Sequence, residues 1–241
     1  MSRSNRTDAV NPANRFFKWK GGDGELVYFD KSLGEHGEEV KVEMPFRFMV
    51  LDVLAGAAGG NTVNGQYQSY WSNAVRNTKK QQLIVRSKGG TVARGYYEDI
   101  KGKDGIKFQQ LVYIAFREGD GPLQIGCLKL TGAALGAWFD FQKIQKDIYA
   151  GAISIDGRGE KEKNGATVFY RPVFSHISEV TPESEAQAVE LDKHLQEYFE
   201  MYFSNAVVEE DDAPHYSGNI DDYEDDALER EAIMAEAAGA F

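Results

Sequence analysis

Residues that build disulfides, metal centres and membrane spans are scarce in this sequence. A single cysteine, Cys127, excludes an internal disulfide and a zinc site made of several cysteines. The four histidines are scattered without the spacing of metal ligands: His36, His176, His194 and His215. No apolar run approaches the roughly 18 residues of a transmembrane helix, and the first residues lack the apolar centre of a secretory signal. We therefore expect a cytoplasmic protein with no metal and no membrane contact.

Motifs of catalysis and nucleotide binding are also missing. The sequence has no nucleophile elbow and no glycine pattern of a nucleotide-binding fold. The glycine-rich stretch at residues 55–61, AGAAGGN, lacks the Lys-Ser/Thr ending of a phosphate-binding loop, and we interpret it as a flexible loop. These absences favour a protein that is not an enzyme and uses no cofactor. A catalytic site assembled from distant residues would leave no motif, so an enzyme stays an alternative.

The charge is distributed unevenly along the chain. The sequence has 27 Lys and Arg against 38 Asp and Glu, for a net charge of −11. Residues 205–241 hold 12 of the acids and one base, so the 26 acids and 26 bases of residues 1–204 balance. The low isoelectric point therefore belongs to the C-terminal segment, and it does not argue against nucleic-acid binding by the rest of the chain.

The most informative stretch spans residues 67–107, where cations alternate with large aromatic rings. Its nine basic residues are Arg76, Lys79, Lys80, Arg86, Lys88, Arg94, Lys101, Lys103 and Lys107. Its five large aromatic residues are Tyr67, Tyr70, Trp71, Tyr96 and Tyr97. Cations that follow a phosphate backbone and rings on which bases stack are the two components of a surface for single-stranded nucleic acid. The alternative is that the rings belong to the core and the cations are ordinary solvated charge.

Two further expectations concern single rings. Trp19 lies between two lysines and is a candidate base contact, although an aromatic residue near the start of a chain commonly packs onto the core. Neighbouring residues of a strand point to opposite faces. We therefore expect only one of Tyr70 and Trp71 to contact nucleic acid, and only one of Tyr96 and Tyr97, unless a bulge intervenes.

Residues 25–177 have the pattern of antiparallel β-structure. Runs rich in Val, Ile, Phe and Tyr alternate with turn clusters, and short connections between such runs imply hairpins. One run is TVARGYYEDI, and a longer turn is expected at residues 156–165. A helix is expected after Thr131, and a second at residues 183–203, where apolar residues recur at intervals of three and four.

The order of these elements predicts a fold. Strands, then a helix, then two final strands is the order of an OB-fold barrel. We expect a mainly β, OB-fold-like antiparallel barrel over residues 25–204, with hairpin insertions, one inserted helix and one C-terminal helix. Residues 1–24 are expected to be a flexible basic and aromatic arm, and the acidic residues 205–241 a disordered tail.

The C-terminal segment carries a resemblance to a known group of proteins. It contains Asp221, Asp222, Asp225 and Asp226 and closes on Phe241, and it resembles the acidic tails of bacterial and bacteriophage single-stranded DNA-binding proteins. The segment YWSNAVRNTKK is similar, more loosely, to phage DNA-binding proteins. In those families an OB-fold body binds DNA and the tail recruits replication and repair enzymes. The resemblance implies that Asp225, Asp226 and Phe241 bind such partner proteins.

These observations together predict a bacterial or bacteriophage protein that binds single-stranded DNA without sequence preference during replication, recombination and repair. If it is phage-encoded, its place is the host cytoplasm. The acidic tail is expected to compete with DNA for the basic surface, or to serve solubility alone. Two other classes stay open: an adaptor of the replisome or of RNA polymerase that acts through the tail, and an RNA-binding protein. The sequence makes no prediction of oligomeric state.

Overall fold

The computed structural model describes residues 10–206, which have the mainly β architecture that the sequence predicts. The strands are β1 (Arg15–Lys20), β2 (Glu25–Asp30), β3 (Glu38–Lys41), β4 (Phe46–Val63), β5 (Gln66–Ser72), β6 (Leu83–Ser87), β7 (Gly90–Gly95), β8 (Ile106–Phe116), β9 (Gln124–Leu130), β10 (Ala152–Asn164) and β11 (Thr167–Ile177). The helices are α1 (Tyr97–Ile100), α2 (Gly132–Ile144) and α3 (Pro182–Ala206), with a short 3-10 helix, η1 (Lys103–Gly105). The two longer helices confirm the helices predicted from sequence.

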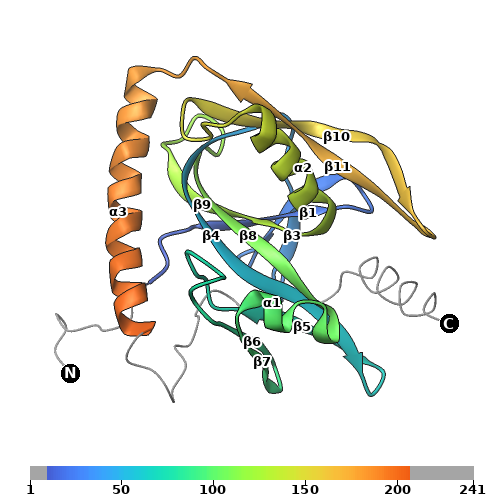
Figure 1. Ribbon diagram of the computed structural model, residues 1–241. Helices are drawn as coiled ribbons and strands as arrows, with labels where there is room; N and C mark the ends of the chain where they lie inside the picture. The colour runs from blue at the N-terminus through green and yellow to red at the C-terminus, as the bar shows by residue number, and fades with distance from the viewer. Residues whose placement is uncertain (1–9, 207–241) are drawn as a thin grey trace.

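The strands form one mixed sheet in the order β3-β2-β1-β9-β8-β4-β5-β6-β7, and β10 pairs with β4 and β11. Paired strands are antiparallel except β1 and β9, which are parallel. The sheet curls around α2, and α3 lies along its outside (Figure 1). We call the side toward α2 the inner face and the side toward α3 the outer face. Strand β4 joins the parts of the sheet, because it pairs with β5, β8 and β10.

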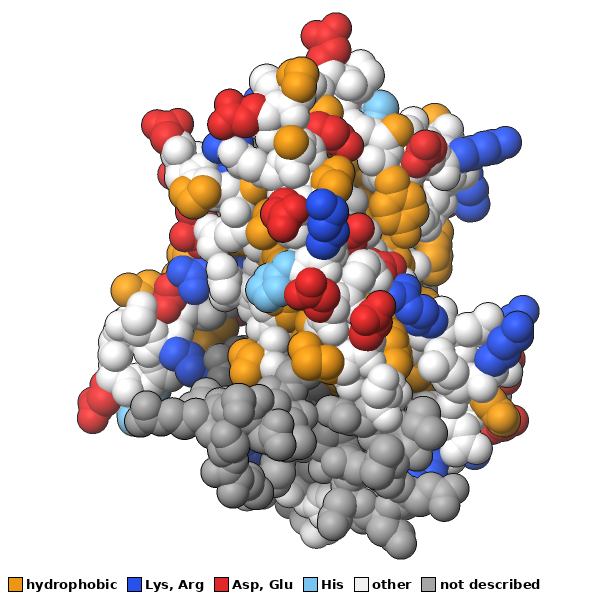
Figure 2. Space-filling model, turned by 90° about the vertical axis from the view of Figure 1, so that its left-hand side faces the viewer, with side chains coloured by type: hydrophobic (Ala, Val, Ile, Leu, Met, Phe, Trp, Pro, Cys, Tyr) orange, Lys and Arg blue, Asp and Glu red, His pale blue; other side chains and the backbone are white. Residues whose placement is uncertain are grey.

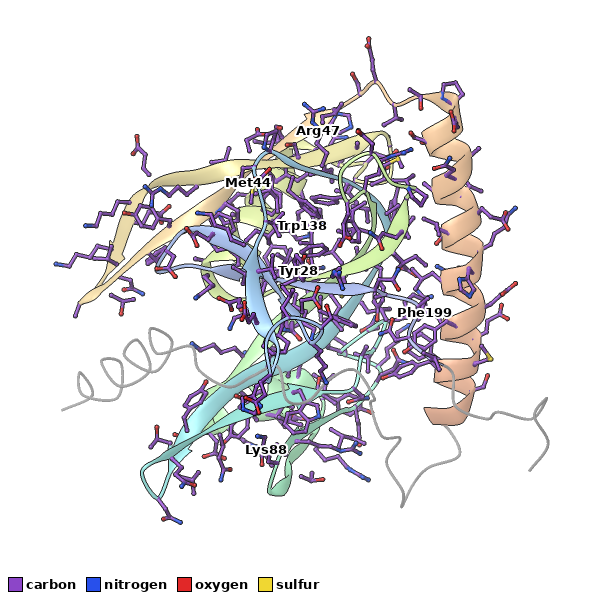
Figure 3. The ribbon with its side chains drawn as sticks, turned by 180° about the vertical axis from the view of Figure 1, so that it is seen from behind. Tyr28, Met44, Arg47, Lys88, Trp138 and Phe199 are labelled. Carbon is purple, nitrogen blue, oxygen red and sulfur yellow. The ribbon has the colours of Figure 1, made fainter. Side chains whose placement is uncertain are left out.

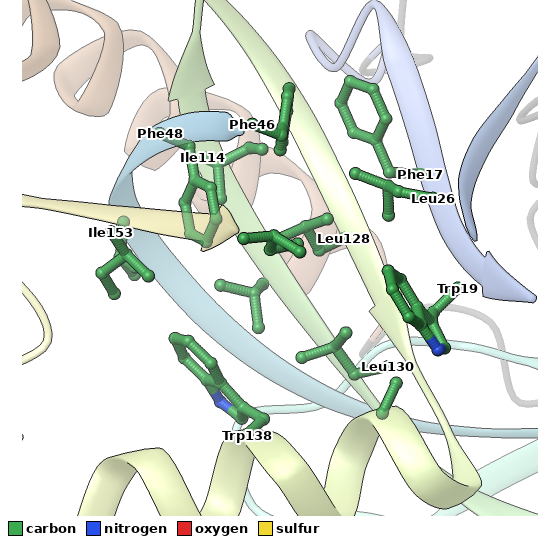
Figure 4. Close-up of a cluster of buried hydrophobic side chains, with 14 of the residues drawn as sticks. Phe17, Trp19, Leu26, Phe46, Phe48, Ile114, Leu128, Leu130, Trp138 and Ile153 are labelled. Atoms are coloured by element: carbon green, nitrogen blue, oxygen red, sulfur yellow. The ribbon is translucent and has the colours of Figure 1, made fainter. Parts of the chain in front are cut away.

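The main core fills the inner face. Trp138 of α2 is fully buried, and its ring stacks on Phe141 at 5.6 Å and meets Phe174 of β11 edge-on at 5.2 Å. Phe17 of β1 packs edge-on against Phe116 of β8 at 4.9 Å. Figure 4 shows this cluster, with Trp138 reaching from α2 toward the strands. Burial of each such side chain contributes about 1.5–3 kcal/mol, so this cluster fixes α2 and the curvature of the sheet.

A second core lies between α3 and the outer face. Leu195 and Phe199 are buried, and the Phe199 ring meets Tyr113 of β8 edge-on at 5.0 Å. Figure 3 places Phe199 on the side of α3 that faces the sheet. The opposite side of α3 carries mainly acidic side chains, with Lys193 as the one lysine of the helix (Figure 2), as expected for the solvent side of an amphipathic helix. Within residues 10–206, no helix combines the length and apolar character needed to span a membrane.

Strands β5, β6 and β7 extend the sheet past the part that α3 covers, and this extension has a core of its own. Its inner-face residues Tyr70, Leu83 and Val85 are buried against Ile100 of α1 and Ile106 of β8. A sheet with one packed face is stable while its other face stays open to solvent. The packing of the extension therefore does not depend on its outer face.

Residues 15–20, which the sequence places in a flexible arm, form strand β1. Phe17 and Trp19 alternate into the main core, and Trp19 Nε1 donates a hydrogen bond to the Tyr170 carbonyl oxygen at 2.9 Å. The backbone of β1 is hydrogen-bonded on both sides, by β2 and by β9. The sequence does not reveal this strand, because the pairing partner β9 lies far along the chain.

The glycine-rich stretch at residues 55–61, expected to be a flexible loop, is part of β4. Strands β5 and β8 flank it and supply backbone hydrogen bonds that offset the weak strand propensity of Gly and Ala. Small residues are required here, since a Cβ on Gly59 would lie 2.2 Å from the Gly105 carbonyl oxygen.

Two other boundaries also differ from expectation. Residues 156–164, expected to form most of a long turn, continue β10, and the pairing with β11 runs until Asn164 meets Thr167. The run TVARGYYEDI is a strand only as far as Gly95 and continues as helix α1. Tertiary contacts decide both boundaries, and neither the polar composition of the first segment nor the aromatic composition of the second indicates them.

Candidate nucleic-acid interface

The register of the sheet places a row of cationic and aromatic side chains on the outer face of the extension. Ala58 of β4 is paired with Lys107 of β8 on one side and with Trp71 of β5 on the other, and Trp71 is paired with Arg86 of β6. Paired residues of antiparallel strands share a face, so these side chains project to the same side. Arg94 of β7 joins them, because its partner lies two residues from Arg86 on β6.

Small residues occupy the middle of this surface. Gly56, Ala58 and Gly60 are alternate residues of β4 that face the outer side, where they present at most a methyl group. Tyr67 of β5 lies across this line, since a Cβ on Gly60 would be 2.5 Å from the Tyr67 hydroxyl oxygen. Taller side chains therefore stand on both sides of a low strip. We call this surface the Trp71 face and define it by Tyr67, Trp71, Arg86, Arg94 and Lys107.

The cations of the Trp71 face have no ion-pair partner in the part of the chain that the structure describes. Within residues 10–206, neither Arg86, Arg94 nor Lys107 lies within ion-pair distance of a carboxylate. Lys107 and Arg94 are exposed, and Trp71 and Arg86 are half-buried. A half-buried indole among unpaired cations offers an anion with an aromatic group both a stacking surface and charge neutralisation.

The end of α3 borders the Trp71 face. The Tyr202 hydroxyl accepts a hydrogen bond from the Ala74 backbone N–H at 3.0 Å. Burial raises the pKa of Tyr202, and the nearby positive charge of Arg86 acts in the opposite direction. Arg86 therefore lies close enough to the last turns of α3 for its charge to be felt there. Helix α3 ends at Ala206, the last residue that the structure describes.

Two of the aromatic candidates belong to the core. Trp19 is 7% exposed and Tyr70 is 4% exposed, so neither ring offers a face to a base. Strand alternation explains the second case, because Tyr70 points to the inner face and Trp71 to the outer one. Tyr97 packs edge-on against Phe108 at 5.2 Å, and burial raises the pKa of its hydroxyl. Tyr96 is exposed just before α1.

The side chain of Arg76 is held by contacts with the sheet and with α3. Its Nη1 donates to Asp52 Oδ2 at 2.9 Å, and its Nη2 donates to Gln196 of α3 at 3.0 Å. The guanidinium also lies over the Phe199 ring, 5.4 Å from its centroid, and over Phe203 at 5.5 Å. These contacts fasten α3 to the sheet, so Arg76 leaves the set of candidate ligand contacts.

The other basic candidates lie in connections around the extension. Lys79 and Lys80 are exposed between β5 and β6, and Lys103 is exposed in η1. Lys88 lies at the turn between β6 and β7 (Figure 3). Lys101 is paired with Glu98 at 2.6 Å, which lowers the pKa of that carboxyl. The structure thus brings part of the basic stretch together and distributes the rest around its edge.

Reasoning from sequence missed the strip of small residues and the neighbouring end of α3. The sequence has only a continuous run of Gly and Ala at residues 55–60, and this run does not indicate which of its members share a face. The described residues contain no group of three or more His, Cys, Asp or Glu arranged to hold a metal ion. Burial raises the pKa of the Cys127 thiol to about 12, and this keeps it in the unreactive protonated form.

Residues Asp225, Asp226 and Phe241, expected to bind partner proteins, lie outside the described residues. Comparison with known proteins gives no match: no family model, no curated protein and no solved structure is significantly similar to this chain.

Proposed function

We propose that this protein binds single-stranded DNA without sequence preference, through the Trp71 face, and that it has no catalytic role. The observation that carries the proposal is the row of Lys107, Trp71 and Arg86 across β8, β5 and β6, with a strip of small residues between them. Cations that have no ion pair within residues 10–206, beside a half-buried indole, fit an extended chain of phosphates and bases.

Rough magnitudes support this choice of ligand. Each base stacked on an aromatic side chain contributes about 1–3 kcal/mol, whatever the base. The cations Arg86, Arg94 and Lys107 would each neutralise about one phosphate, which predicts a salt slope of about −2 for these three alone. Base stacking and phosphate neutralisation are both independent of the nucleotide sequence. The cations at the edge, such as Lys79, Lys80 and Lys103, would add to the second term.

The connectivity favours an OB-fold-like arrangement as the framework. Strands β4, β8 and β9, then α2, then β10 and β11 follow the order expected for such a barrel, with β1–β3 and β5–β7 as additions to it. In OB-folds the outer surface of the second and third strands binds oligonucleotides. Here α3 covers the outer face of β8 near Tyr113. The additional strands β5–β7 therefore supply the binding surface in its place.

The acidic segment would act as a competitor for the same surface. Residues 205–241 hold 12 acids and one base, and they follow the helical turn whose Tyr202 is hydrogen-bonded to Ala74, just after β5. A segment tethered this closely has an effective concentration near 1 mM at its target. DNA binding would displace the acidic segment and leave it accessible to replication, recombination or repair proteins.

A titration of labelled oligonucleotides followed by fluorescence anisotropy tests the proposal. We expect oligo-dT to bind more tightly than duplex DNA of the same length, with log K falling linearly as log salt rises. Oligo-rU in the same assay separates a preference for DNA from a general affinity for single strands. Tighter binding to duplex, or an affinity that salt does not change, contradicts the proposal. Absence of binding to all three would favour the adaptor that acts through its tail.

A further inference from the structure

The long hairpin of β10 and β11 carries a second basic surface, distinct from the Trp71 face. Figure 1 shows this hairpin projecting from the side of the sheet opposite α3. Three cations of β10 are paired with three residues of β11: Arg158 with Pro172, Lys161 with Tyr170, and Lys163 with Val168. Pro172, Tyr170 and Val168 alternate along an uninterrupted strand and so share one face, which we call the Tyr170 face. Their three basic partners lie on it as well.

A β-bulge creates this alignment. Arg158 and Lys161 are three residues apart, and regular alternation would point them to opposite faces. The register shifts by one residue between these two positions, which restores them to the same side. Bulges of this kind re-aim side chains and are common beside functional sites. The bulge thus gives the Tyr170 face all three cations of this part of β10.

Of the acidic residues beside these cations, Glu162 lies on the other face of the hairpin, whereas Glu160 lies in the bulge itself. Glu162 is paired with Phe169 across the ladder, and its carboxylate lies 3.9 Å from Arg171 Nε. Arg171 also pairs with Asp140 of α2, which helps to lower the pKa of that carboxyl to about 2. The ion pairs on this face fasten the hairpin to α2. They leave the Tyr170 face without a carboxylate from the paired strand positions.

The three cations of the Tyr170 face have no ion pair within residues 10–206. The Arg158 guanidinium lies over the Tyr170 ring, 4.8 Å from its centroid, and Nη1 donates to the Asp23 backbone carbonyl oxygen at 3.4 Å. Lys161 and Lys163 are exposed. One cation is therefore held in place, and two extend into solvent beside an aromatic ring.

We infer that the Tyr170 face is a second contact for the phosphate backbone of single-stranded nucleic acid, which lengthens the binding site beyond the Trp71 face. The ligand class rests on the proposed function, whereas the contact itself rests on the hairpin. Lys161 and Lys163 are about 6.5–7 Å apart along the strand. This spacing suits successive phosphates of an extended strand, and the adjacent ring suits a base.

The salt dependence of oligo-dT binding by the Lys161→Gln/Lys163→Gln variant tests this inference. Each cation that neutralises a phosphate of a single strand contributes about 0.7 to the salt slope, so we expect the slope to fall by about 1.4. The matched control is Lys31→Gln/Lys193→Gln, which makes the same change in net charge in the β2–β3 connection and on the exposed side of α3. Its slope should stay at the wild-type value. Lys161→Arg/Lys163→Arg should keep the wild-type slope too.

The outcomes separate this inference from the proposed function. Equal slopes for the Gln variant and its control, with wild-type binding intact, overturn the second contact and leave the Trp71 face standing. A wild-type protein that binds no oligonucleotide overturns the proposed function and the second contact with it. If the double variant melts early, Lys163→Gln alone measures the same effect at about half its size, near 0.7 in slope. An unchanged slope in that single variant also overturns the second contact.

Discussion

Trp138 and Trp71 lie on opposite faces of one sheet and have opposite surroundings. Trp138 on the inner side is fully buried between α2 and the strands, in contact with Phe141 and Phe174. Trp71 on the outer side is half-buried, with a row of cations beside it and only Ala58 as its neighbour on β4. The difference lies in what covers each ring. Helix α2 packs on the first ring, whereas the end of α3 only borders the face that carries the second.

This contrast teaches where an aromatic residue of this fold contributes to stability and where it is free for binding. The inner face is closed by hydrophobic contacts, so its rings are needed for folding. The outer face of the extension lies over a separate core around Tyr70 and Leu83, which holds β5 and β6 in place from behind. Changes at Trp71 should therefore affect binding without affecting the fold.

The largest effect is expected on the buried side of the comparison. Trp138→Ala should lower the free energy of unfolding by about 3–5 kcal/mol, because it removes a fully buried ring and leaves a cavity under α2. Chemical denaturation followed by circular dichroism measures the loss. Trp138→Phe is the matched control and should cost much less, since the indole N–H has no acceptor within residues 10–206. A loss below about 1 kcal/mol for the Ala variant would contradict the assignment of Trp138 to the core.

On the exposed side, Trp71→Ala should weaken oligo-dT binding by about 1–3 kcal/mol through the loss of one stacked base. The melting temperature should change little. Trp71→Phe should retain most of the affinity, because a smaller ring still stacks. If instead Trp71→Ala melts early and binds normally when folded, the ring is structural and the Trp71 face is wrong.

The acidic segment offers a test of the outer face as a whole. Deleting residues 207–241 removes 12 acids and one base. If the segment binds the Trp71 face with a dissociation constant of about 0.1 mM, an effective concentration near 1 mM would reduce DNA affinity about tenfold. Deletion should restore that factor at low salt and much less of it at high salt, because the competition is electrostatic. Equal affinities with and without the segment at low salt would rule out the competition.

The smallest effect is expected at the boundary between the two regions. Arg76→Gln removes the hydrogen bond to Asp52 and the contact with Phe199, and it should destabilise the protein by about 0.5–1.5 kcal/mol. Binding of oligo-dT should be nearly unchanged, since this side chain is directed toward α3. Arg86→Gln is the matched control, with the same change of charge on the Trp71 face, and should have the reverse pattern. A greater loss of affinity for the Arg76 variant would return that residue to the interface.

Composition and periodicity were enough to predict the mainly β architecture and both long helices. The apolar spacing around Leu195 and Phe199, for example, is the pattern of a helix that covers a sheet. The sequence did not predict which strands pair when they lie far apart in the chain. Strand β1 depends on β9, and the Gly/Ala stretch of β4 depends on flanking strands, so neither has a local signal. Propensity is a weak guide where both edges of a strand are already paired.

The basic and aromatic stretch was identified from sequence, but its arrangement was not. Alternation correctly separates Tyr70 from Trp71, because one pattern holds along β5. It does not apply at Tyr96 and Tyr97, where α1 begins, although Tyr97 is half-buried by its packing against Phe108. The cations of the hairpin were hidden by a bulge, which changes the parity of a strand and leaves no mark in composition.

The parallel pairing of β1 with β9 has a consequence for how the chain folds. Asn14 and Gln124, whose side chains are hydrogen-bonded at this junction, are 110 residues apart in sequence. Loop closure over such a distance is slow, and during synthesis the early segment with Phe17 and Trp19 must wait for its partner strand. Until β9 has been synthesised, β1 lacks one of the two strands that flank it in the final sheet. The nascent chain therefore passes through an aggregation-prone stage, and we expect its yield to depend on temperature and on chaperones more than its final stability does.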